Sequence, residues 1–437
     1  MADIGKASTT RLGFLIYAVT CSGPYGLEEM VSTSGPGLAL VLLLVVPVIY
    51  AAPIAYVCAE LTARYPVEGG YYRWVRTAFG DFLGYLAAWL AYLTMFMANA
   101  AFAVNFSAYL AYLMPGVDRP AQVGVSVALV WIATSLNYRG IRFVGALTIG
   151  LTFLILAPTV IMTVLALIHG NHDPFVPFAH LDKPFGGAVG GGLLIALYFF
   201  GGFEKLTLNA GEVQNPRRAF ALALAVVVPA CAMTFFLPTF AALQISGDLT
   251  AWQEGHFAVV AERVGGGPLG AAMAAGGMLS NYCLLMVTIL AQSRLPMVLA
   301  QDGMFPARFA GRHPRYGTPV PALVLGGVIL TPLCVLPFAE LAGLYSLVQI
   351  LAYVLIYAAL FKLRSTCSPG STSAPLSAAV VVALALPTVG LAVVVGRGFL
   401  LTYGLTQAIF ALGLLASGPL TYLLFRRVRG ASAGSGP

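Results

Sequence analysis

Apolar stretches of about 20 residues recur along the whole sequence, and they limit the folds that this chain can adopt. A helix of that length with few charges can cross the hydrocarbon core of a bilayer. Only 9% of the 437 residues are charged, whereas soluble domains average about 25%. Such a chain has too few polar side chains to cover its surface in water. The sequence therefore predicts an all-α polytopic membrane protein.

The hydropathy pattern predicts twelve membrane-spanning helices. Their approximate bounds are 11–34, 37–63, 82–113, 120–136, 143–168, 187–213, 219–244, 268–297, 319–338, 342–363, 376–396 and 399–425. Residues 249–267 are too polar to span a bilayer, and we expect them to form a surface helix outside it.

Basic residues are concentrated in alternate loops. If the N-terminus lies in the cytoplasm, 18 of the 23 lysines and arginines fall in cytoplasmic segments, four fall in outer loops and Lys205 lies within the sixth span. Because cytoplasmic loops are enriched in Lys and Arg, we expect both termini in the cytoplasm and the protein in the cell inner (cytoplasmic) membrane. This topology accounts for the net charge of +7, so no nucleic-acid partner is needed to explain it.

Two predicted spans are interrupted by helix-breaking residues. The first contains Gly23, Pro24 and Gly26, and the sixth contains Gly201 and Gly202. Proline and glycine weaken a helix, and the freed backbone groups are tolerated in a membrane only inside protein or beside a cavity. One such break is also explained by a simple kink, but two breaks five spans apart favour a transporter with inverted repeats and a substrate site at the breaks.

Four segments together resemble the amino acid–polyamine–organocation (APC) transporter superfamily. They are CSGPYGLEEMVSTSGPGLAL, AELTARYPVEGGYYRWVRTAFG, FEKLTLNAGEVQNPRRAF and AQDGMFPARFAGRHPRYGTPVPAL. The GPYG-x-EE form and the RYGTP loop look most like the branch of polyamine and L-type amino acid uptake carriers. The resemblance extends over about residues 10–425.

The resemblance implies a LeuT-like fold in which helices 1 and 6 are discontinuous, and transport by alternating access. Its parts would be a cytoplasmic segment (1–10), repeat one with helices 1–5 (11–168), repeat two with helices 6–10 (187–363), helices 11–12 (376–425) and a cytoplasmic tail (426–437). The substrate would be an amino acid or polyamine, with coupling to protons in many members and exchange in others. No cofactor is implied.

The resemblance also implies which residues bind the substrate. In the first helix these are Ser22, Gly23, Pro24, Tyr25 and Gly26, and in the sixth helix they are Gly201, Gly202, Phe203 and Glu204. An aromatic lid is expected at Tyr198 or Phe199, and a substrate-facing amide at Asn99. Some proton-coupled members use a lysine in the fifth helix, but residues 143–168 contain none.

The acids beside the two breaks suggest a cationic substrate and a proton pathway. Glu204 lies deep in the sixth span, where burial disfavours charge, so we expect it to carry the coupled proton; a static pair with Lys205 is the alternative. Glu28 and Glu29 are neighbours on a helix and point about 100° apart. We expect one of them, with Glu28 favoured, to face the substrate and the other to cap the short outer helix.

Other polar residues have structural explanations. Salt bridges are expected at the cytoplasmic side between three acids (Glu60, Glu68, Glu212) and four arginines (Arg64, Arg73, Arg217, Arg218). Four further side chains could line the cavity or pack between helices: Tyr282, Thr288, Tyr345 and Gln349. The six cysteines suit core packing, and the histidines near residues 169–180 suit a solvated loop better than a metal site.

The chain lacks the motifs of an enzyme, such as a phosphate-binding loop or a nucleophile elbow. We therefore expect a secondary active transporter, proton-coupled and taking a cationic amino acid or a polyamine. An amino acid exchanger or a carrier of neutral amino acids is the first alternative. A channel or a non-transporting receptor is a second, from a different class.

Overall fold

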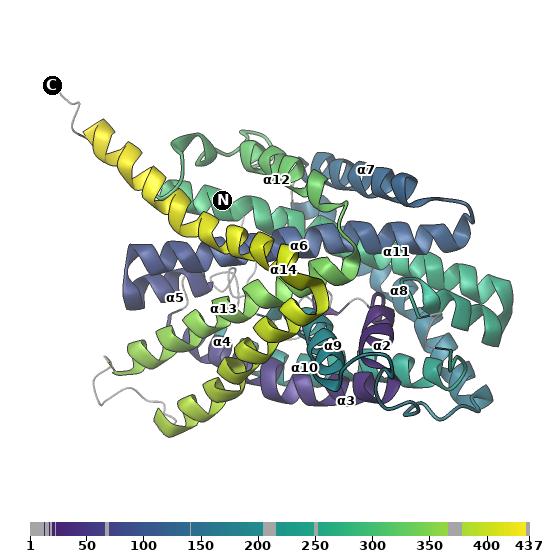
Figure 1. Cartoon of the computed structure of the whole chain (residues 1–437). Helices are drawn as coiled ribbons and strands as arrows, with labels where there is room; N and C mark the ends of the chain where they lie inside the picture. Colours follow the sequence, from purple (N-terminus) through teal and green to yellow (C-terminus); the bar gives the residue numbers. More distant parts are fainter. Residues whose placement is uncertain are drawn as a thin grey trace.

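The computed structural model describes residues 13, 17, 20, 21, 23–65, 70–139, 141–203, 216–248, 252–365 and 378–433. Within these residues the secondary structure is helical, with no strand. Ser22, Glu68, Glu204, Lys205 and Glu212 lie outside the described residues. Figure 1 shows long helices laid side by side and crossing one another at moderate angles.

The first half of the described chain runs from the first break to the second. Its helices are α2 (Glu28–Ser34), α3 (Pro36–Val46), a π-helical turn (Pro47–Ala51), α4 (Ala52–Arg64), α5 (Gly70–Phe79), α6 (Asp81–Leu113), α7 (Arg119–Asn137), α8 (Ile141–His169) and α9 (Phe185–Phe199). In the second half the helices are α10 (Pro216–Leu243), α11 (His256–Gln301), a 3-10 turn (Ala307–Phe309), α12 (Val320–Leu333), α13 (Phe338–Ser365) and α14 (Ala378–Ala433).

Seven helices among the described residues are long and apolar enough to cross a membrane, and three shorter ones are also apolar. The expectation of a polytopic, all-helical membrane protein is therefore confirmed. Most predicted spans match a helix to within a few residues: span 82–113 corresponds to Asp81–Leu113, and span 120–136 to Arg119–Asn137. Helix formation follows apolar runs closely because every backbone group must be bonded within its own segment in lipid.

One boundary differs from the prediction and another agrees with it, and a glycine explains each. The last two predicted spans are two helices within α14, and they meet at Gly404 (φ 82°) and not near residues 397–398. The helix expected within residues 249–267 begins at His256 and is separated from the rest of α11 by non-helical backbone at Gly266 (φ 76°), as predicted. Glycine adopts this left-handed region without steric cost, so the chain changes direction there.

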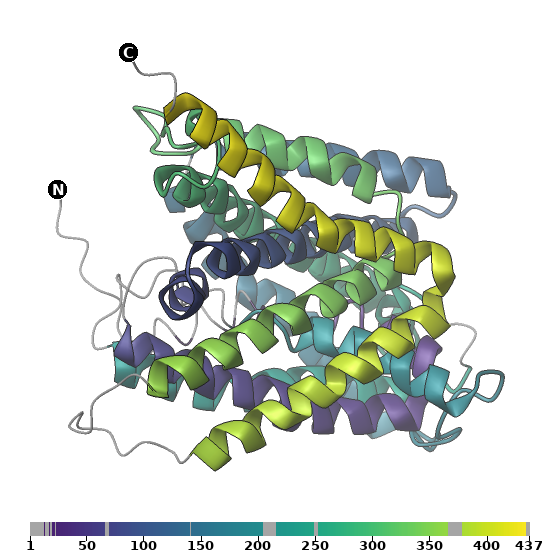
Figure 2. The same ribbon diagram turned by 60° about the vertical axis from the view of Figure 1, so that its left-hand side comes forward.

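Helix α6 forms the centre of the molecule. Its most apolar stretch is 89% buried, and it packs against α5, α7, α11 and α13. By contrast, the apolar stretch of α14 is only 11% buried. This helix runs along the outside of the bundle in both ribbon views (Figures 1 and 2), where apolar side chains such as Leu405, Ile409 and Leu412 are exposed. An exposed apolar face of this length suits contact with lipid.

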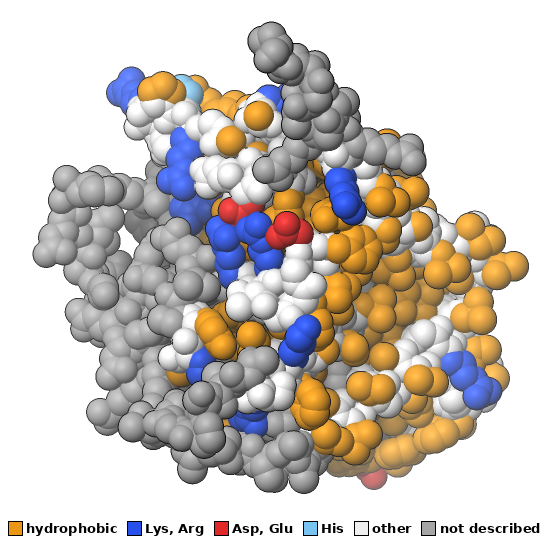
Figure 3. All heavy atoms as spheres, turned by 90° about the vertical axis from the view of Figure 1, so that its left-hand side faces the viewer, with side chains coloured by type: hydrophobic (Ala, Val, Ile, Leu, Met, Phe, Trp, Pro, Cys, Tyr) orange, Lys and Arg blue, Asp and Glu red, His pale blue; other side chains and the backbone are white. Residues whose placement is uncertain are grey.

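One end of the bundle is rich in basic side chains. This end carries α5, on the left of Figure 1, and Figure 3 views it directly. Lys and Arg side chains gather there beside an apolar flank (Figure 3). Such a concentration at one end is typical of the cytoplasmic side of a membrane protein.

Candidate functional site

The first span is broken at the glycines where the sequence predicts the break. Gly23 has φ 110° and Gly26 has φ 103°, and α2 begins only at Glu28. Neither value is compatible with a right-handed helix, and both would strain a residue with a Cβ atom. Residues 23–27 therefore form an open stretch of backbone.

A second break follows α9. The helix ends at Phe199, and Gly202 has φ 100°. At Gly201 a Cβ atom would lie 2.8 Å from the Tyr345 hydroxyl oxygen, so a larger residue would collide with α13. The Gly202 amide donates a 3.3 Å hydrogen bond to the Tyr353 hydroxyl. Thus the backbone of this break lies directly against two tyrosines of α13.

A small cavity of about 50 Å³ lies between the two breaks. It is lined by Thr20, Gly23, Tyr25, Ala98, Phe102, Tyr198, Phe199, Gly201, Phe235, Ser280, Asn281, Leu284, Phe338 and Tyr345. These residues come from both breaks and from α6, α10, α11 and α13. Among the described lining residues there is no Asp, Glu, Lys or Arg, and half are aromatic.

Tyr198 is the centre of the aromatic wall. Its ring makes edge-to-face contacts with Phe199, Phe338 and Tyr345, with centroid distances of 5.3, 5.5 and 5.1 Å. The side chain is 8% exposed, and its hydroxyl has no hydrogen-bond partner among the described residues. A buried polar atom without a partner is costly, so this hydroxyl is a ready contact for a polar group of a ligand.

Hydrogen bonds to neighbouring helices fix Tyr25 in the open stretch of the first span. The Asn105 side-chain amide donates a 3.1 Å hydrogen bond to the carbonyl oxygen of Tyr25. The Tyr25 hydroxyl donates to the carbonyl of Ile155 at 2.9 Å and lies 3.1 Å from the Thr159 hydroxyl. Tyr25 is therefore fixed from α6 and α8 while it lines the cavity.

Glu28 lies outside this lining, although the sequence favours it as a cavity ligand. Its side chain is fully buried, and its carboxylate accepts hydrogen bonds from the Gly26 amide (2.7 Å), the Tyr109 hydroxyl (2.5 Å) and the Phe257 amide (3.4 Å). These donors belong to the break, to α6 and to α11, and α2 itself has no side-chain cap hydrogen bond among the described residues, so Glu28 does not cap the short helix that it begins.

Asn99 also lies outside the lining. Its side-chain amide donates a 2.6 Å hydrogen bond to Gln292, and its oxygen accepts one from the Thr288 hydroxyl. This cluster joins α6 to α11 within the core. In the structure Asn99 and Thr288 therefore contribute to helix packing, and the neighbours Ala98 and Phe102 reach the cavity instead.

A pair of acids lies near the start of α2. The Glu29 and Glu254 side chains are hydrogen-bonded to each other, which requires a proton on one carboxyl group. Burial raises the pKa of Glu254, while its backbone, Arg119 and Glu29 act in the opposite direction. Lys183 lies close by: it donates a 3.3 Å hydrogen bond to the Thr33 carbonyl, and burial lowers its pKa.

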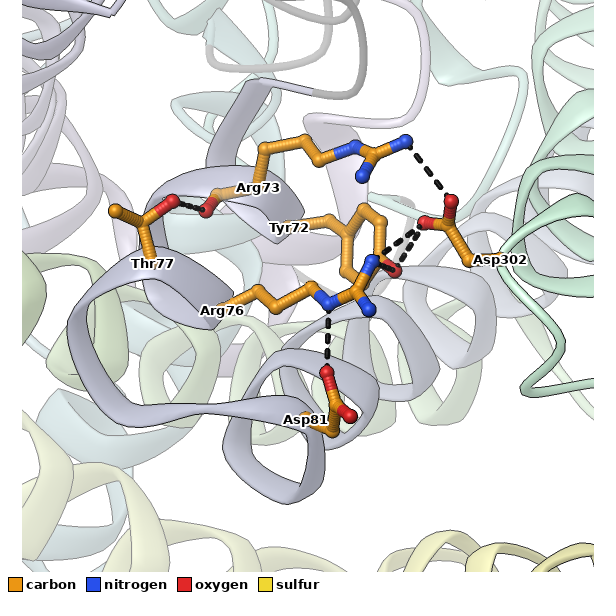
Figure 4. A network of polar contacts seen from close by, with 6 residues as sticks. All are labelled: Tyr72, Arg73, Arg76, Thr77, Asp81 and Asp302. Atoms are coloured by element: carbon orange, nitrogen blue, oxygen red, sulfur yellow. Dashed lines mark hydrogen bonds and ion pairs between the residues drawn. The ribbon is translucent and has the colours of Figure 1, made fainter.

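At the basic end of the molecule, Asp302 joins α11 to α5 (Figure 4). Its carboxylate accepts a 2.5 Å hydrogen bond from Tyr72 and lies 3.0 Å from Arg73 and 3.1 Å from Arg76. Arg76 also binds Asp81 at 2.7 Å. The sequence analysis missed this cluster, because no local pattern connects Asp302 with residues about 230 positions earlier.

A second ionic cluster contains one of the predicted salt bridges. Glu60 pairs with Arg64 at 2.9 Å, as expected, and it also forms a two-pronged contact with Arg364 at the end of α13. Arg73, expected to pair with one of three glutamates, binds Asp302. The five described cysteines are buried, as the packing interpretation requires.

Comparison with known proteins adds direct support for the family. The amino acid permease family matches residues 13–415. The polyamine transporter PUT1 of Oryza sativa subsp. japonica is 30% identical over 419 residues, which cover 94% of this chain and 76% of that protein. The polyamine transporter RMV1 of Arabidopsis thaliana is 28% identical, with 83% of this chain and 74% of that protein covered.

A bacterial relative shows the same coverage of its own length. The uncharacterized transporter Mb2022c of Mycobacterium bovis is 31% identical, over 75% of this chain and 74% of that protein. Family and relatives are transporters and not enzymes. With its apolar helices, its interrupted spans and the cavity between them, the chain belongs to the amino acid permease family of the APC superfamily, as a multi-pass membrane transporter.

Proposed function

We propose that the protein is a secondary active transporter for amino acids or polyamines, with a cationic substrate favoured. The observation that carries this proposal is the cavity between the two helix breaks, which is lined by residues of both. Gly23 and Gly201 bring backbone to it, and Tyr25, Tyr198 and Phe199 bring aromatic rings. The named polyamine transporters among the relatives support the substrate class.

Aromatic side chains give the site a means of attracting a cation without a carboxylate. The face of an aromatic ring attracts an ammonium group by about 0.5–2 kcal/mol, more when water is excluded. Tyr198, Phe338 and Tyr345 surround one side of the cavity, and the Tyr198 hydroxyl adds a hydrogen-bonding atom. In this proposal an amine of the substrate binds against these rings.

The size of the cavity supports transport by alternating access. A volume of about 50 Å³ holds roughly three to five water molecules at ~10–15 Å³ each. An amino acid or polyamine needs more room, so the wall must move when the substrate enters. In our proposal the aromatic residues beside the second break, Tyr198 and Phe199, move with α9 and open the cavity to one side at a time.

The proposed architecture is that of twelve spans arranged as a five-plus-five repeat. Repeat one covers residues 11–168, repeat two covers 187–363, and helices 11–12 cover 376–425. The two breaks, at Gly23–Gly26 and at Gly201–Gly202, occupy matching places in these halves. The basic end of the bundle supports a cytoplasmic position for α5 and for both termini in the cell inner membrane.

Proton coupling is the further element of the proposal. Glu204 follows the second break directly in sequence, and span 143–168 lacks a lysine. An acid at that depth favours its neutral form, so its protonation can be linked to a change between outward and inward states. The proposed substrate ligands within the breaks are the residues named from the resemblance, with Tyr198, Phe199 and Gly201 facing the described cavity.

The test is uptake by purified protein in proteoliposomes, with labelled diamine, basic and neutral amino acids, each with and without an imposed pH gradient. We expect diamine or basic amino acid to accumulate uphill when the outside is acidic, with no requirement for sodium. Glu204→Gln should keep substrate binding and lose the response to the gradient, whereas Asp81→Asn, a substitution at an exposed acid, should keep both. Strict sodium dependence, or an unchanged pH response in Glu204→Gln, would contradict the coupling proposal.

A carrier or exchanger of neutral amino acids is the second candidate. The described lining of the cavity has no charged side chain, which favours a substrate without net charge. Competition separates the two candidates: neutral amino acids, but not diamines, would displace the labelled substrate. Uptake that occurs only into vesicles preloaded with substrate would identify exchange.

A further inference from the structure

The open backbone of the first span needs hydrogen-bond partners inside the protein. An unwound segment within a membrane leaves amide groups that cost several kcal/mol each if they stay unpaired. At Gly26 the partner is the side chain of Glu28, two residues later, at 2.7 Å. The break and the acid that follows it are thus one structural unit.

The same carboxylate joins this unit to two other helices. Its Oε2 atom accepts from Gly26, and its Oε1 atom accepts from Tyr109 on α6 and from Phe257 at the start of α11. Glu28, Tyr109 and Phe257 are each fully buried. Three donors from three segments therefore converge on one buried side chain.

The position of Tyr109 separates Glu28 from the cavity lining. Tyr25 lines the cavity, and its ring packs edge-to-face on Tyr109 with a centroid distance of 5.4 Å. Neither Tyr109 nor Glu28 belongs to the lining. A carboxylate has about four acceptor positions, and three are used by protein donors, so little capacity is left for an ammonium group.

We infer that Glu28 is a positioning residue of the transport cycle, whose carboxylate holds the open backbone of residues 23–27 against α6 and α11 and does not bind the substrate. Only the predicted effect on the transport rate rests on the proposed transporter function. Tyr109 shares the role, since the hydrogen bond from its hydroxyl is the shortest of the three that the Glu28 carboxylate accepts. Loss of either side chain should loosen the break and slow the transition between states for every substrate alike.

The experiment compares Glu28→Gln, Tyr109→Phe and the double variant with Glu29→Gln as the matched control from the neighbouring position. Initial uptake rates are measured in proteoliposomes for one diamine and one neutral amino acid. In Glu28→Gln a side-chain amide must face either the Gly26 or the Phe257 amide, and neither can accept its proton. We expect the maximal rate to fall about tenfold or more for both substrates, with KM changed by less than about threefold.

Hydrogen–deuterium exchange of the segment 23–31 in the purified protein gives a readout that needs no transport. Exchange should become faster in Glu28→Gln and in Tyr109→Phe, and the double variant should show little more than either single change. Glu29→Gln should leave it unchanged. If Glu28→Gln does not fold, the exchange measurement on Tyr109→Phe, which removes one of the three donors, tests the inference by itself.

Two outcomes would overturn the inference. The first is a selective rise of at least about tenfold in KM for the diamine in Glu28→Gln with unchanged exchange, which would identify Glu28 as a substrate ligand. The second is unchanged exchange in both single variants. If no substrate is transported at all, the proposed function fails, but the exchange measurement still decides the role of Glu28.

Discussion

The hydroxyl of Tyr72 donates a 2.5 Å hydrogen bond to the carboxylate of Asp302, and this contact connects α5 to the end of α11. Burial and the hydrogen bond to Asp302 raise the pKa of Tyr72, so it remains a donor throughout the physiological range. The next residue, Arg73, and Arg76, one turn further along α5, bind the same carboxylate (Figure 4). One acid thus neutralises two arginines that would otherwise repel each other.

Asp302→Asn should weaken this end of the bundle. Hydrogen bonds to a charged group contribute about 1.5–3 kcal/mol each, but the arginines are partly exposed and screened. We therefore expect a loss of about 1–3 kcal/mol in the free energy of unfolding. Thermal unfolding of the purified protein measures it, with Asp81→Asn as the control, because Asp81 contacts Arg76 at a more exposed position. Equal stability of the two variants would show that Asp302 is not the main partner.

The helices were predictable because lipid requires them. Spans such as Asp81–Leu113 are fixed by length and apolar character alone, and their bounds followed from the sequence to within a residue or two. The two breaks were predictable for the same reason, since glycine and proline interrupt otherwise continuous apolar runs. The change of direction at Gly404 was missed because the boundary between the last two spans was placed at the charged residue Arg397.

Side-chain direction at the site was less predictable. Adjacent acids after a break fit both ligand and cap, and only the positions of Tyr109 and Phe257 show where the Glu28 carboxylate points. Asn99 fits a cavity face equally well until Gln292 is seen to bind it. The contact between Tyr72 and Asp302 depends on how α5 packs against α11, which no local pattern contains.

Glu254→Gln should change how stability depends on pH. Burial raises the folded-state pKa of this carboxyl above its ordinary value of 4.5. The protonated form is therefore the one that the fold favours, and its contribution is complete below the unfolded pKa and is lost as pH rises through the folded pKa. The glutamine, which stays neutral, should be more stable than the wild type at neutral pH, and the difference should shrink as pH falls.

Thermal unfolding measured from about pH 4 to about pH 8, the range in which a buried carboxyl group titrates, checks this expectation. Arg119 and Glu29 face Glu254, and the titration of Glu29, which is hydrogen-bonded to Glu254, should change together with it in the variant. Glu262→Gln is the control, since this acid is exposed on α11, the helix that begins just after Glu254. A wild type and a Glu254→Gln variant with parallel profiles would contradict the prediction.

Arg364→Lys should destabilise the contact between α4 and α13. Arg364 binds Glu60 with two nitrogens, and both side chains are only 11% exposed. Lysine keeps the charge but offers a single ammonium group in place of the planar fork. We expect a loss of about 1.5–3 kcal/mol in the free energy of unfolding, the range for hydrogen bonds to a charged group. Arg64→Lys, which removes a single contact at a more exposed position, should cost under about 1 kcal/mol.

The last prediction uses the hydroxyl of Tyr198 to separate binding from folding. Because this hydroxyl has no partner among the described residues and is buried, its removal in Tyr198→Phe should leave the unfolding temperature unchanged or raise it. If the substrate supplies the missing partner, the variant should bind it about 2- to 12-fold more weakly, the factor for a hydrogen bond of ~0.5–1.5 kcal/mol. Tyr92→Phe is the matched control: its hydroxyl is also buried without a described partner, but Tyr92 does not line the cavity. Competition for labelled substrate, measured with unfolding temperature on the same preparations, should therefore show weaker binding in Tyr198→Phe alone. Equal effects of the two substitutions would mean that the substrate does not reach Tyr198.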